Sequence, residues 1–380
     1  MSAPSVSQLT SMSTLANWAP SVACVEADLT QLFTLDPLSD SRWDAFVNSH
    51  PRGSVFHQKA WLQALFRTYR YRPVVLTSAR EGEPLSDGIV FCRVSSWITG
   101  TRMVSVPFAD HCEPLLSGNG DGLQLDSLNF SQWMHNECDR HSRKYVELRP
   151  LSSDGYRIGT MVPGQSFWFH SLDLTPALEE IFRGMHKDSM QRRIRHAERQ
   201  QLSYATGSND QFIDDFYRLL VITRRRHQLL PQPRAWFRNL IASMGQNVCI
   251  RVVCKDRVPI AAMLTLHHRN TVVYKYGCSD ERFHNLAGMP FLFWKVIEEG
   301  KASGAQVLDL GRTDLDNEGL TVFKDRLGAA RRRISYLRYP QGAQRQGAQT
   351  SQHPAARRLL AALPDRFMPW AGRVVYRHMG

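Results

Sequence analysis

The chain has 380 residues, of which 43% are hydrophobic and 22% are charged, and its formal net charge is +12. This composition is typical of a water-soluble globular protein, but the positive charge favours acidic partners such as phosphates, nucleic acid or an anionic membrane surface. Seven cysteines without C-x-x-C spacing argue against a disulfide framework and a structural metal site, and no window has the ~18 apolar residues of a membrane span. The length predicts two domains, and the first residues lack the pattern of a signal peptide, so we expect a cytoplasmic protein.

The first half of the chain has the pattern of an α/β domain, which we place at residues 26–160 after a disordered leader at residues 1–25. Apolar residues at helical spacing begin near residue 40, and β-branched and aromatic runs bounded by turn residues then predict strands. The predicted elements are strands at Pro73–Ala79, Gly88–Val94 and Arg102–Val106, a helix at Leu123–His141 and a strand at Tyr145–Arg149. A Gly-, Pro- and Ser-rich stretch over residues 150–164 marks the predicted boundary.

The second half, residues 161–340, repeats this order of elements at larger scale. Its predicted elements are a strand at Phe167–Leu172, helices at Met185–Gln200, Asp210–Arg226 and 233–244, a hairpin of Val248–Cys254 with Pro259–His267, a strand at Thr271–Ser279, a helix at Pro290–Ser303 and a strand at Val307–Leu310. The shared order, without a residue-level repeat, predicts two similar α/β domains with mixed sheets flanked by helices. The last strand, helix and strand form a βαβ unit whose strand ends offer a ligand-binding crevice.

Residues 341–380 are predicted to be a linker followed by a basic amphipathic tail. They contain six Arg and one Asp, and from Ala355 the arginines alternate with Leu, Phe, Trp and Val. Such a tail suits an anionic membrane surface, which would place the protein at the inner face of the membrane. The alternative is a helix that packs back on the body with its charges in solvent.

Several short segments of the second half have amino-acid sequences typical of one enzyme family. They are Met190–Arg199, Thr223–His227 followed by Gln232-Pro233, Pro259–Ala262, Tyr274–Gly277, Asp309–Asp314 and the motif Gly319-Leu-x-x-Phe-Lys324. In these segments the chain resembles the FemAB-like or BioF2-like acetyltransferases of the GNAT superfamily, some of which are associated with exopolysaccharide and exosortase systems. The resemblance extends from about Arg42 to Tyr339. It implies two tandem GNAT-like acyltransferase domains related to the Fem peptidyltransferases, which move amino acids from aminoacyl-tRNA onto peptidoglycan precursors.

The resemblance also implies a function. We expect an N-acyltransferase or aminoacyltransferase that uses acyl-CoA, such as acetyl-CoA, or aminoacyl-tRNA as its donor, with no metal. The expected acceptor is a phosphate-bearing cell-envelope or exopolysaccharide precursor, and tRNA is a partner if it carries the acyl group. Because the segment Arg282–Pro290 departs from the usual phosphate-binding pattern, the alternative is a catalytically degenerate binding or scaffold protein of a polysaccharide assembly system.

Three residues are predicted to act in catalysis, namely Lys324, Asp309 and Tyr274. Lys324, which the resemblance places at the active site, would stabilise oxyanion or phosphate charge; the alternative is a surface lysine paired with Asp325. Asp309 would accept a proton from the incoming amine or hydroxyl, unless it only pairs with Arg312. Tyr274 would protonate the leaving group, and strand alternation would place it on the same face as Tyr276, unless both are core aromatics.

The remaining predicted residues would hold substrates. Arg312 and Tyr276 are expected near the acceptor, and Arg192, Arg193 and Arg195 on one basic helix would hold its phosphates. The alternative for this helix is a solvated charged face. Gly288 and Asn285 lie in the segment that corresponds to the donor-binding loop of GNAT enzymes, so the resemblance places them at the cofactor.

Overall fold

The computed structural model describes residues 31–117, 127–139, 143–152, 160–340 and 367–380. The strands are β1 (Phe33–Leu35), β2 (Arg72–Thr77), β3 (Ile89–Val94), β4 (Arg102–Val104), β5 (Val146–Leu148), β6 (Val162–Asp173), β7 (Ser203–Gly207), β8 (Val248–Lys255), β9 (Val258–His268), β10 (Thr271–Ser279), β11 (Val307–Asp314) and β12 (Ala330–Tyr339). The α-helices are α1 (Arg42–Ser49), α2 (Lys59–Tyr69), α3 (Leu128–Asp139), α4 (Leu178–Gly184), α5 (Arg192–Glu198), α6 (Asp210–Arg226), α7 (Arg234–Met244), α8 (Gly288–Ala302), α9 (Glu318–Arg326) and α11 (Met368–Tyr376). The predicted leader and most of the predicted linker lie outside the described residues.

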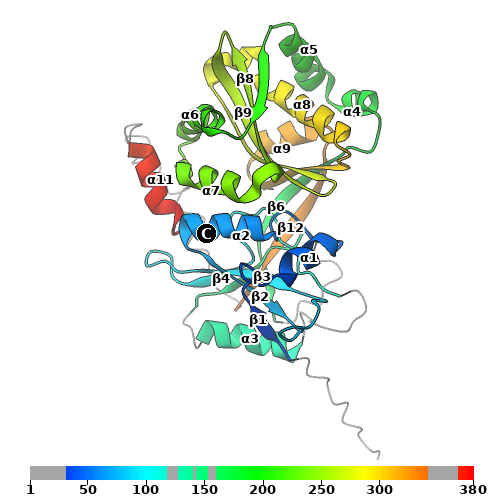
Figure 1. Ribbon diagram of the computed structural model, residues 1–380. Helices are drawn as coiled ribbons and strands as arrows, with labels where there is room; N and C mark the ends of the chain where they lie inside the picture. Colours follow the sequence, from blue (N-terminus) through cyan, green and yellow to red (C-terminus); the bar gives the residue numbers. More distant parts are fainter. Residues whose placement is uncertain (1–30, 118–126, 140–142, 153–159, 341–366) are drawn as a thin grey trace, which may run out of the picture.

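The described strands form one mixed 12-stranded sheet in the order β1-β2-β3-β4-β5-β12-β6-β11-β10-β9-β8-β7. Its two ends repeat each other. β1 to β4 are antiparallel neighbours and β4 pairs in parallel with β5, while β7 to β10 are antiparallel neighbours and β10 pairs in parallel with β11. The predicted α/β architecture of two similar halves is therefore confirmed (Figure 1).

β12 joins the two halves at the middle of the sheet. β6, the first strand after the predicted boundary, pairs with β11 of the C-terminal half, whereas β12 ends the C-terminal half but pairs with β5 of the N-terminal half. β6 and β12 also pair with each other over most of their length. The predicted boundary over residues 150–164 follows β5 and overlaps the start of β6, and β12 joins its two sides because it pairs with both strands.

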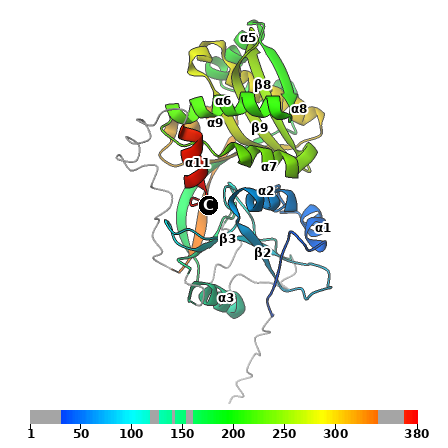
Figure 2. The same ribbon diagram turned by 60° about the vertical axis from the view of Figure 1, so that its left-hand side comes forward.

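One apolar core spans both halves on one face of the sheet. It contains buried side chains from α1, α2, α6 and α7, and the rings of Trp61 in α2 and Trp236 in α7 meet edge to face at 5.2 Å. Both views show α2 and α7 side by side where the halves meet (Figures 1 and 2). On the other face, α8 and its neighbours cover the C-terminal half and α3 covers the N-terminal half. The shared core fixes the relative position of the two halves.

The end of the chain packs against this body. In α11, Met368, Gly372 and Tyr376 are buried at intervals of four residues, and the Tyr376 hydroxyl donates to the carbonyl of Leu230 at 3.1 Å. The Tyr71 hydroxyl donates to the Tyr376 carbonyl at 3.0 Å. Residues 367–380 thus follow the second of the two predicted alternatives, although their outer face remains exposed. No helix within the described ranges is long and apolar enough to cross a membrane.

Candidate active site at the meeting of the two halves

The site lies where β10 and β11 separate. The two strands pair in parallel only over Thr271–Val273 and Val307–Asp309, after which β10 continues along β9 and β11 continues along β6. Each strand has an irregularity at this point, between Tyr274 and Tyr276 in β10 and between Asp309 and Arg312 in β11. Gly311 lies in the second irregularity with φ +69, a conformation that favours glycine. Bulges of this kind redirect side chains next to binding sites.

The bulge at Lys275 changes which way the two tyrosines point. Tyr276 belongs to the core shared by the two halves and accepts a hydrogen bond from Trp236 Nε1 at 2.9 Å. Tyr274 packs on the opposite face, where its ring meets Phe293 at 4.9 Å. The prediction that both share a face is therefore wrong, because the bulge breaks the two-residue alternation of the strand. Burial raises the pKa of both hydroxyls, so each stays protonated at neutral pH.

Lys324 projects from α9 into this junction. The helix starts at Asn317, whose side chain caps it by accepting from the Leu320 amide at 3.1 Å. The side chain of Lys324 is only 2% exposed, and Nζ donates to the carbonyls of Gly311 at 3.1 Å and Arg312 at 3.3 Å. Burial lowers its pKa to about 8, against the opposing effect of Asp110 and Asp309. Lys324 is thus a fixed buried ammonium group and does not pair with Asp325 at the surface.

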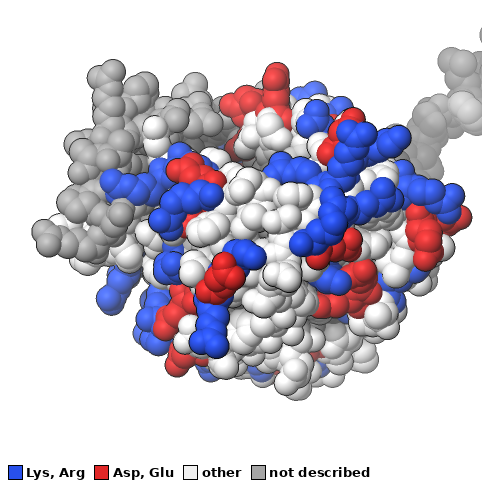
Figure 3. All heavy atoms as spheres, turned by 90° about the horizontal axis from the view of Figure 1, so that it is seen from above, with Lys and Arg blue, Asp and Glu red and all other residues white. Residues whose placement is uncertain are grey.

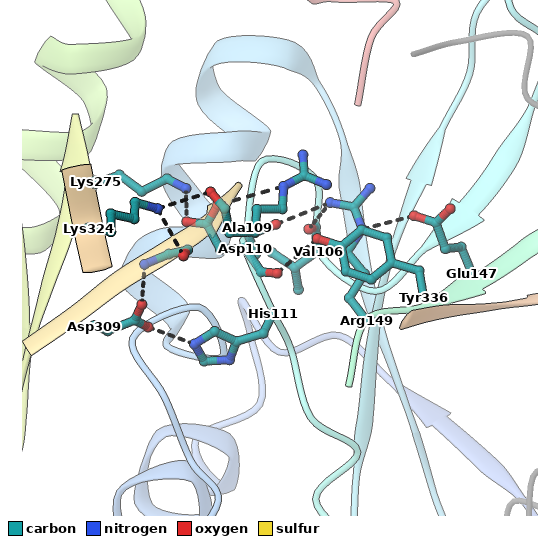
Figure 4. A network of polar contacts seen from close by, with 12 residues as sticks. Val106, Ala109, Asp110, His111, Glu147, Arg149, Lys275, Asp309, Lys324 and Tyr336 are labelled. Carbon is teal, nitrogen blue, oxygen red and sulfur yellow. Dashed lines mark hydrogen bonds and ion pairs between the residues drawn. The ribbon is translucent and has the colours of Figure 1, made fainter. Parts of the chain in front are cut away.

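Asp110 brings the N-terminal half into the same group of side chains (Figure 4). Its carboxylate accepts from Lys275 Nζ at 2.7 Å and lies 3.8 Å from Arg312 Nε. Burial tends to raise the pKa of Asp110, but Lys275 and Arg312 outweigh it, and the pKa is lowered. The Tyr336 hydroxyl donates to the Asp110 carbonyl at 2.8 Å and holds the loop in place. Asp110 is therefore an ionised carboxylate among cations.

Asp309 makes a second connection between the halves. Its Oδ1 accepts from the Gly311 amide at 2.7 Å, and its Oδ2 lies 2.9 Å from Nε2 of His111. The alternative drawn from the sequence was that Asp309 pairs with Arg312. Arg312 instead lies beside Asp110 and over the Phe167 ring at 4.4 Å. The junction therefore joins Lys324, Asp309 and Arg312 of the predicted set with Asp110 and His111.

Sequence reasoning missed Asp110, His111 and Lys275. Asp110 and His111 follow the predicted strand Arg102–Val106, so the rule that polar residues after strand ends form sites could have selected them. Lys275 lies within the predicted strand Thr271–Ser279, and nothing local in the sequence indicates a bulge there.

A cavity of about 340 Å³ lies at the start of α8 and is called the α8 cavity below. Its lining includes Gly288 and Ala261 with Arg193 of α5 and Phe323 and Arg326 of α9. Asn285, which was predicted with Gly288, belongs to the adjacent 3-10 turn Glu281–Leu286 and is not among the lining residues. The amides at the start of α8 and the two arginines suit an anionic group.

The three predicted arginines of α5 have different surroundings. Arg193 lines the α8 cavity and donates to the His284 carbonyl at 2.6 Å. Arg192 is exposed and pairs with Asp188 at 2.8 Å, while Arg195 lies over the Phe182 ring at 5.2 Å. Figure 3 looks down on the end of the molecule that carries α5, where Lys and Arg alternate with acidic and uncharged side chains. Of the three, only Arg193 therefore lines the α8 cavity.

A second cavity, of about 480 Å³, lies between the halves and is called the junction cavity. Ser54 and His111 of the N-terminal half face Thr271, Val307 and Asp309 of the C-terminal half across it. No group of three or more His, Cys, Asp or Glu side chains in the described part of the chain is arranged to hold a metal ion.

Comparison with known proteins connects this geometry with a family. Residues 185–325 match the family model described as an acetyltransferase (GNAT) domain. The structure resembles a crystal structure of FemX with a TM-score of 0.63 and 12% sequence identity, over 81% of this chain and 97% of that chain. It resembles the structure of L-PGS from Bacillus licheniformis with a TM-score of 0.54 and 14% identity, over 91% of this chain and 98% of that chain.

A third similar structure is the C-terminal domain of a putative lysylphosphatidylglycerol synthetase from Agrobacterium fabrum, with a TM-score of 0.50 and 12% identity over 78% of this chain and 91% of that chain. At these identities the structural likeness concerns the fold. Comparison of the sequence with curated proteins gave no match. The family match to the C-terminal half and the repeated sheet of the two halves lead to one conclusion: residues 185–325 form an acetyltransferase (GNAT) domain, in a chain whose two halves repeat the same arrangement of strands.

Proposed function

We propose that this acyltransferase moves an acyl or aminoacyl group onto an amine or hydroxyl of a phosphate-bearing cell-envelope or exopolysaccharide precursor. The observation that carries the proposal is the buried Lys324 ammonium at the point where β10 and β11 separate. Its neighbour Phe323 lines the α8 cavity, so Lys324 lies one residue from the wall of that cavity. The GNAT fold implies an acyl-CoA donor, and aminoacyl-tRNA is the donor that the Fem resemblance adds.

In this proposal the α8 cavity receives the anionic part of the donor and directs the acyl group toward Lys324. A buried cation that is already in position stabilises the negative charge that forms on the carbonyl oxygen during attack. The two carbonyls that hold Nζ keep the cation in place before the reaction, so little reorganisation is needed. Arg193 and Arg326 in the α8 cavity and Arg332 in the junction cavity supply positive charge for phosphate groups on both substrates.

A donor screen tests the proposal. The full chain is incubated with acetyl-CoA, with longer acyl-CoAs or with aminoacyl-tRNA, together with UDP-glucosamine and glucosamine 6-phosphate as phosphate-bearing amino-sugar probes. Saturable thermal stabilisation by a donor and transfer of its labelled acyl group to a probe are expected. Stabilisation by no donor, together with no transfer, would contradict the proposal.

Replacing Arg193 by Gln is expected to raise the KM for the donor by about 10- to 150-fold with little change in kcat. The guanidinium lines the α8 cavity, and losing one charge-assisted contact with a donor phosphate costs about 1.5–3 kcal/mol of binding. This result would mean that Arg193 binds the donor, whereas the sequence alone predicted that it binds the acceptor. Arg192→Gln is the matched control, because Arg192 lies on the same helix, is exposed and pairs with Asp188. Equal donor KM values for the two variants would remove Arg193 from the site.

We also propose that the outer face of α11 contacts an anionic membrane surface. Phe367, Trp370 and Val374 are 43%, 65% and 43% exposed on this face, and Arg373 and Arg377 lie beside them. Apolar side chains next to arginines suit the boundary between acyl chains and anionic headgroups.

The double variant Trp370→Ser/Val374→Ser is therefore expected to co-sediment several-fold less with vesicles rich in phosphatidylglycerol at low salt. Leu128→Ser is the control, because Leu128 is 72% exposed on α3. Equal co-sedimentation of wild type and double variant would contradict membrane contact through α11.

A further inference from the structure

His111 is held rigidly at the junction of the two halves. It lies on the segment that follows β4, its side chain is 6% exposed, and Nε2 is 2.9 Å from Asp309 Oδ2 on β11. The rings of Phe56 and Phe169 contact the imidazole edge to face at 5.3 and 5.5 Å. The imidazole orientation is thus fixed by one carboxylate and two aromatic rings.

The partners of Asp309 determine which ring nitrogen of His111 carries hydrogen. The Asp309 carboxylate accepts from the Gly311 amide through Oδ1, and its Oδ2 accepts from Nε2 of His111. Nε2 therefore holds the hydrogen, and Nδ1 presents a lone pair. Nδ1 is buried and has no hydrogen-bond partner among the described residues. Because leaving a buried polar atom unpaired is unfavourable, this nitrogen is poised for a partner that binds.

The junction cavity has room for such a partner. His111 and Asp309 both line it, and so do side chains from both halves. Val307 and Asp309 of β11 face this cavity, whereas the alternating Leu308 and Leu310 are buried in the core beneath α8. The junction cavity and the core under the α8 cavity thus lie on opposite faces of β11. Asp309, which lines the junction cavity, is also one of the two carboxylates whose charge acts on Lys324.

We propose that His111 is the general base of the transfer reaction and takes the proton from an acceptor amine or hydroxyl held in the junction cavity, while Asp309 positions the imidazole. This inference rests on the proposed function. The acceptor nitrogen or oxygen forms a bond to the donor carbonyl carbon, and its proton passes to Nδ1 of His111. The bond from that carbon to the thioester sulfur, or to the ribose oxygen of a tRNA ester, breaks with its electron pair on the leaving atom. His111 returns a proton to water and the leaving group takes one up, so no further reactant is needed.

Several charged and titratable groups surround His111 and can contribute to the pH dependence of the rate. They are Asp309 of β11, His57 and Arg52 of the segment between α1 and α2, Glu113 of its own segment, His268 of β9 and Arg332 of β12. Burial lowers the pKa of His57 to about 3 and also lowers that of His268. These two histidines are therefore neutral across the neutral range, so a change in the acidic limb that follows substitution of His111 does not come from them.

The test compares His111→Ala, Asp309→Asn and the wild-type chain with acetyl-CoA and UDP-glucosamine. We expect His111→Ala to lower kcat by about 10²–10⁴ and to lose the acidic limb of the pH–rate profile. Added imidazole should restore part of the rate through the space that the side chain leaves. Asp309→Asn should reduce kcat less and keep a limb with an altered midpoint, because the base remains but its orientation is lost. A merely structural His111 would give no rescue and no loss of the limb.

Two further measurements keep the test decisive. His135→Gln is the matched control, because His135 forms an exposed histidine–aspartate pair with Asp139 on α3 at 3.0 Å and should leave the rate unchanged. Nitrogen-15 NMR of the wild-type ring should show hydrogen on Nε2, which needs neither turnover nor a stable variant. Hydrogen on Nδ1, or a His111→Ala rate within threefold of wild type, would overturn the inference. A wild-type chain that transfers to no probe from any donor would instead overturn the proposed function.

Discussion

Replacing Lys324 by Met is expected to lower kcat by about 10²–10³, because it removes the one buried ammonium at the junction that is held by the Gly311 and Arg312 carbonyls. The KM for the donor should change little, since the lysine is expected to act on charge that appears only in the transition state. Lys324→Arg should not restore the rate, because a planar guanidinium does not fit a position that is 2% exposed. The rate is measured at saturating acetyl-CoA and saturating acceptor.

The variant should remain folded, and the pH dependence of its stability gives a second readout. Burial disfavours the charged form of Lys324 and lowers its pKa to about 8 in the folded chain, from its usual 10.5 in an unfolded chain. Between these values the unfolded state binds more protons, and wild-type stability rises with pH by up to about 3 kcal/mol. Lys324→Met should lack this rise and be at least as stable as wild type at pH 7. Denaturant unfolding at pH 7 and pH 10 measures the difference.

A matched control separates catalysis from general damage. Lys295 lies on α8, is partly buried and pairs with Glu298 at 2.8 Å, so Lys295→Met should keep its kcat. The wild-type rate should also fall above pH 8 as Lys324 loses its proton. If Lys324→Met retains its kcat within threefold, the lysine has no part in the reaction and serves only to join α9 to β11.

The elements of this fold could be predicted because their signals are local. The hairpin of β8 and β9 alternates apolar residues around a short turn, and α7 lies between Pro233 and Gly245, so each of them is encoded within about a dozen residues. The order of elements was enough to indicate two similar halves. The pairing of β12 with β5 has no local signal, because β5 comes from the other half of the chain.

The candidate site could be predicted only in part, for the same reason. Lys324, Asp309 and Arg312 lie close together in sequence, and the structure keeps them together. Asp110 is 165 residues from Lys275 in sequence, and no pattern around either residue indicates their contact at 2.7 Å. The bulge at Lys275 also reverses the direction of every later side chain in β10, which local alternation cannot anticipate. When a site lies between two halves, the sequence therefore predicts only the site residues of the half that carries a motif.

The second large effect is expected from Asp110→Asn, because this substitution removes the charge that pairs with Lys275. The carboxylate of Asp110 lies among Lys275 at 2.7 Å, Arg312 at 3.8 Å and Lys324, and the change leaves these cations without their shared anion. Removing one partner from a buried ion pair costs about 3–5 kcal/mol, so the unfolding free energy should fall by that order. Asp256→Asn is the control, because Asp256 is exposed and lies 3.9 Å from Lys255; it should cost under ~1 kcal/mol.

The same variant should change the pH dependence of the reaction in a defined direction. Asp110 is the main group that opposes the lowering of the Lys324 pKa by burial, so its loss should lower that pKa further below 8. The alkaline limb of the rate profile should then move to lower pH. Adding Lys275→Met removes one of the uncompensated cations, so the double variant should lose less stability than the two single variants together. Additive losses and an unmoved alkaline limb would show that Asp110 is electrostatically independent of both lysines, and the junction would then be held together by its aromatic core.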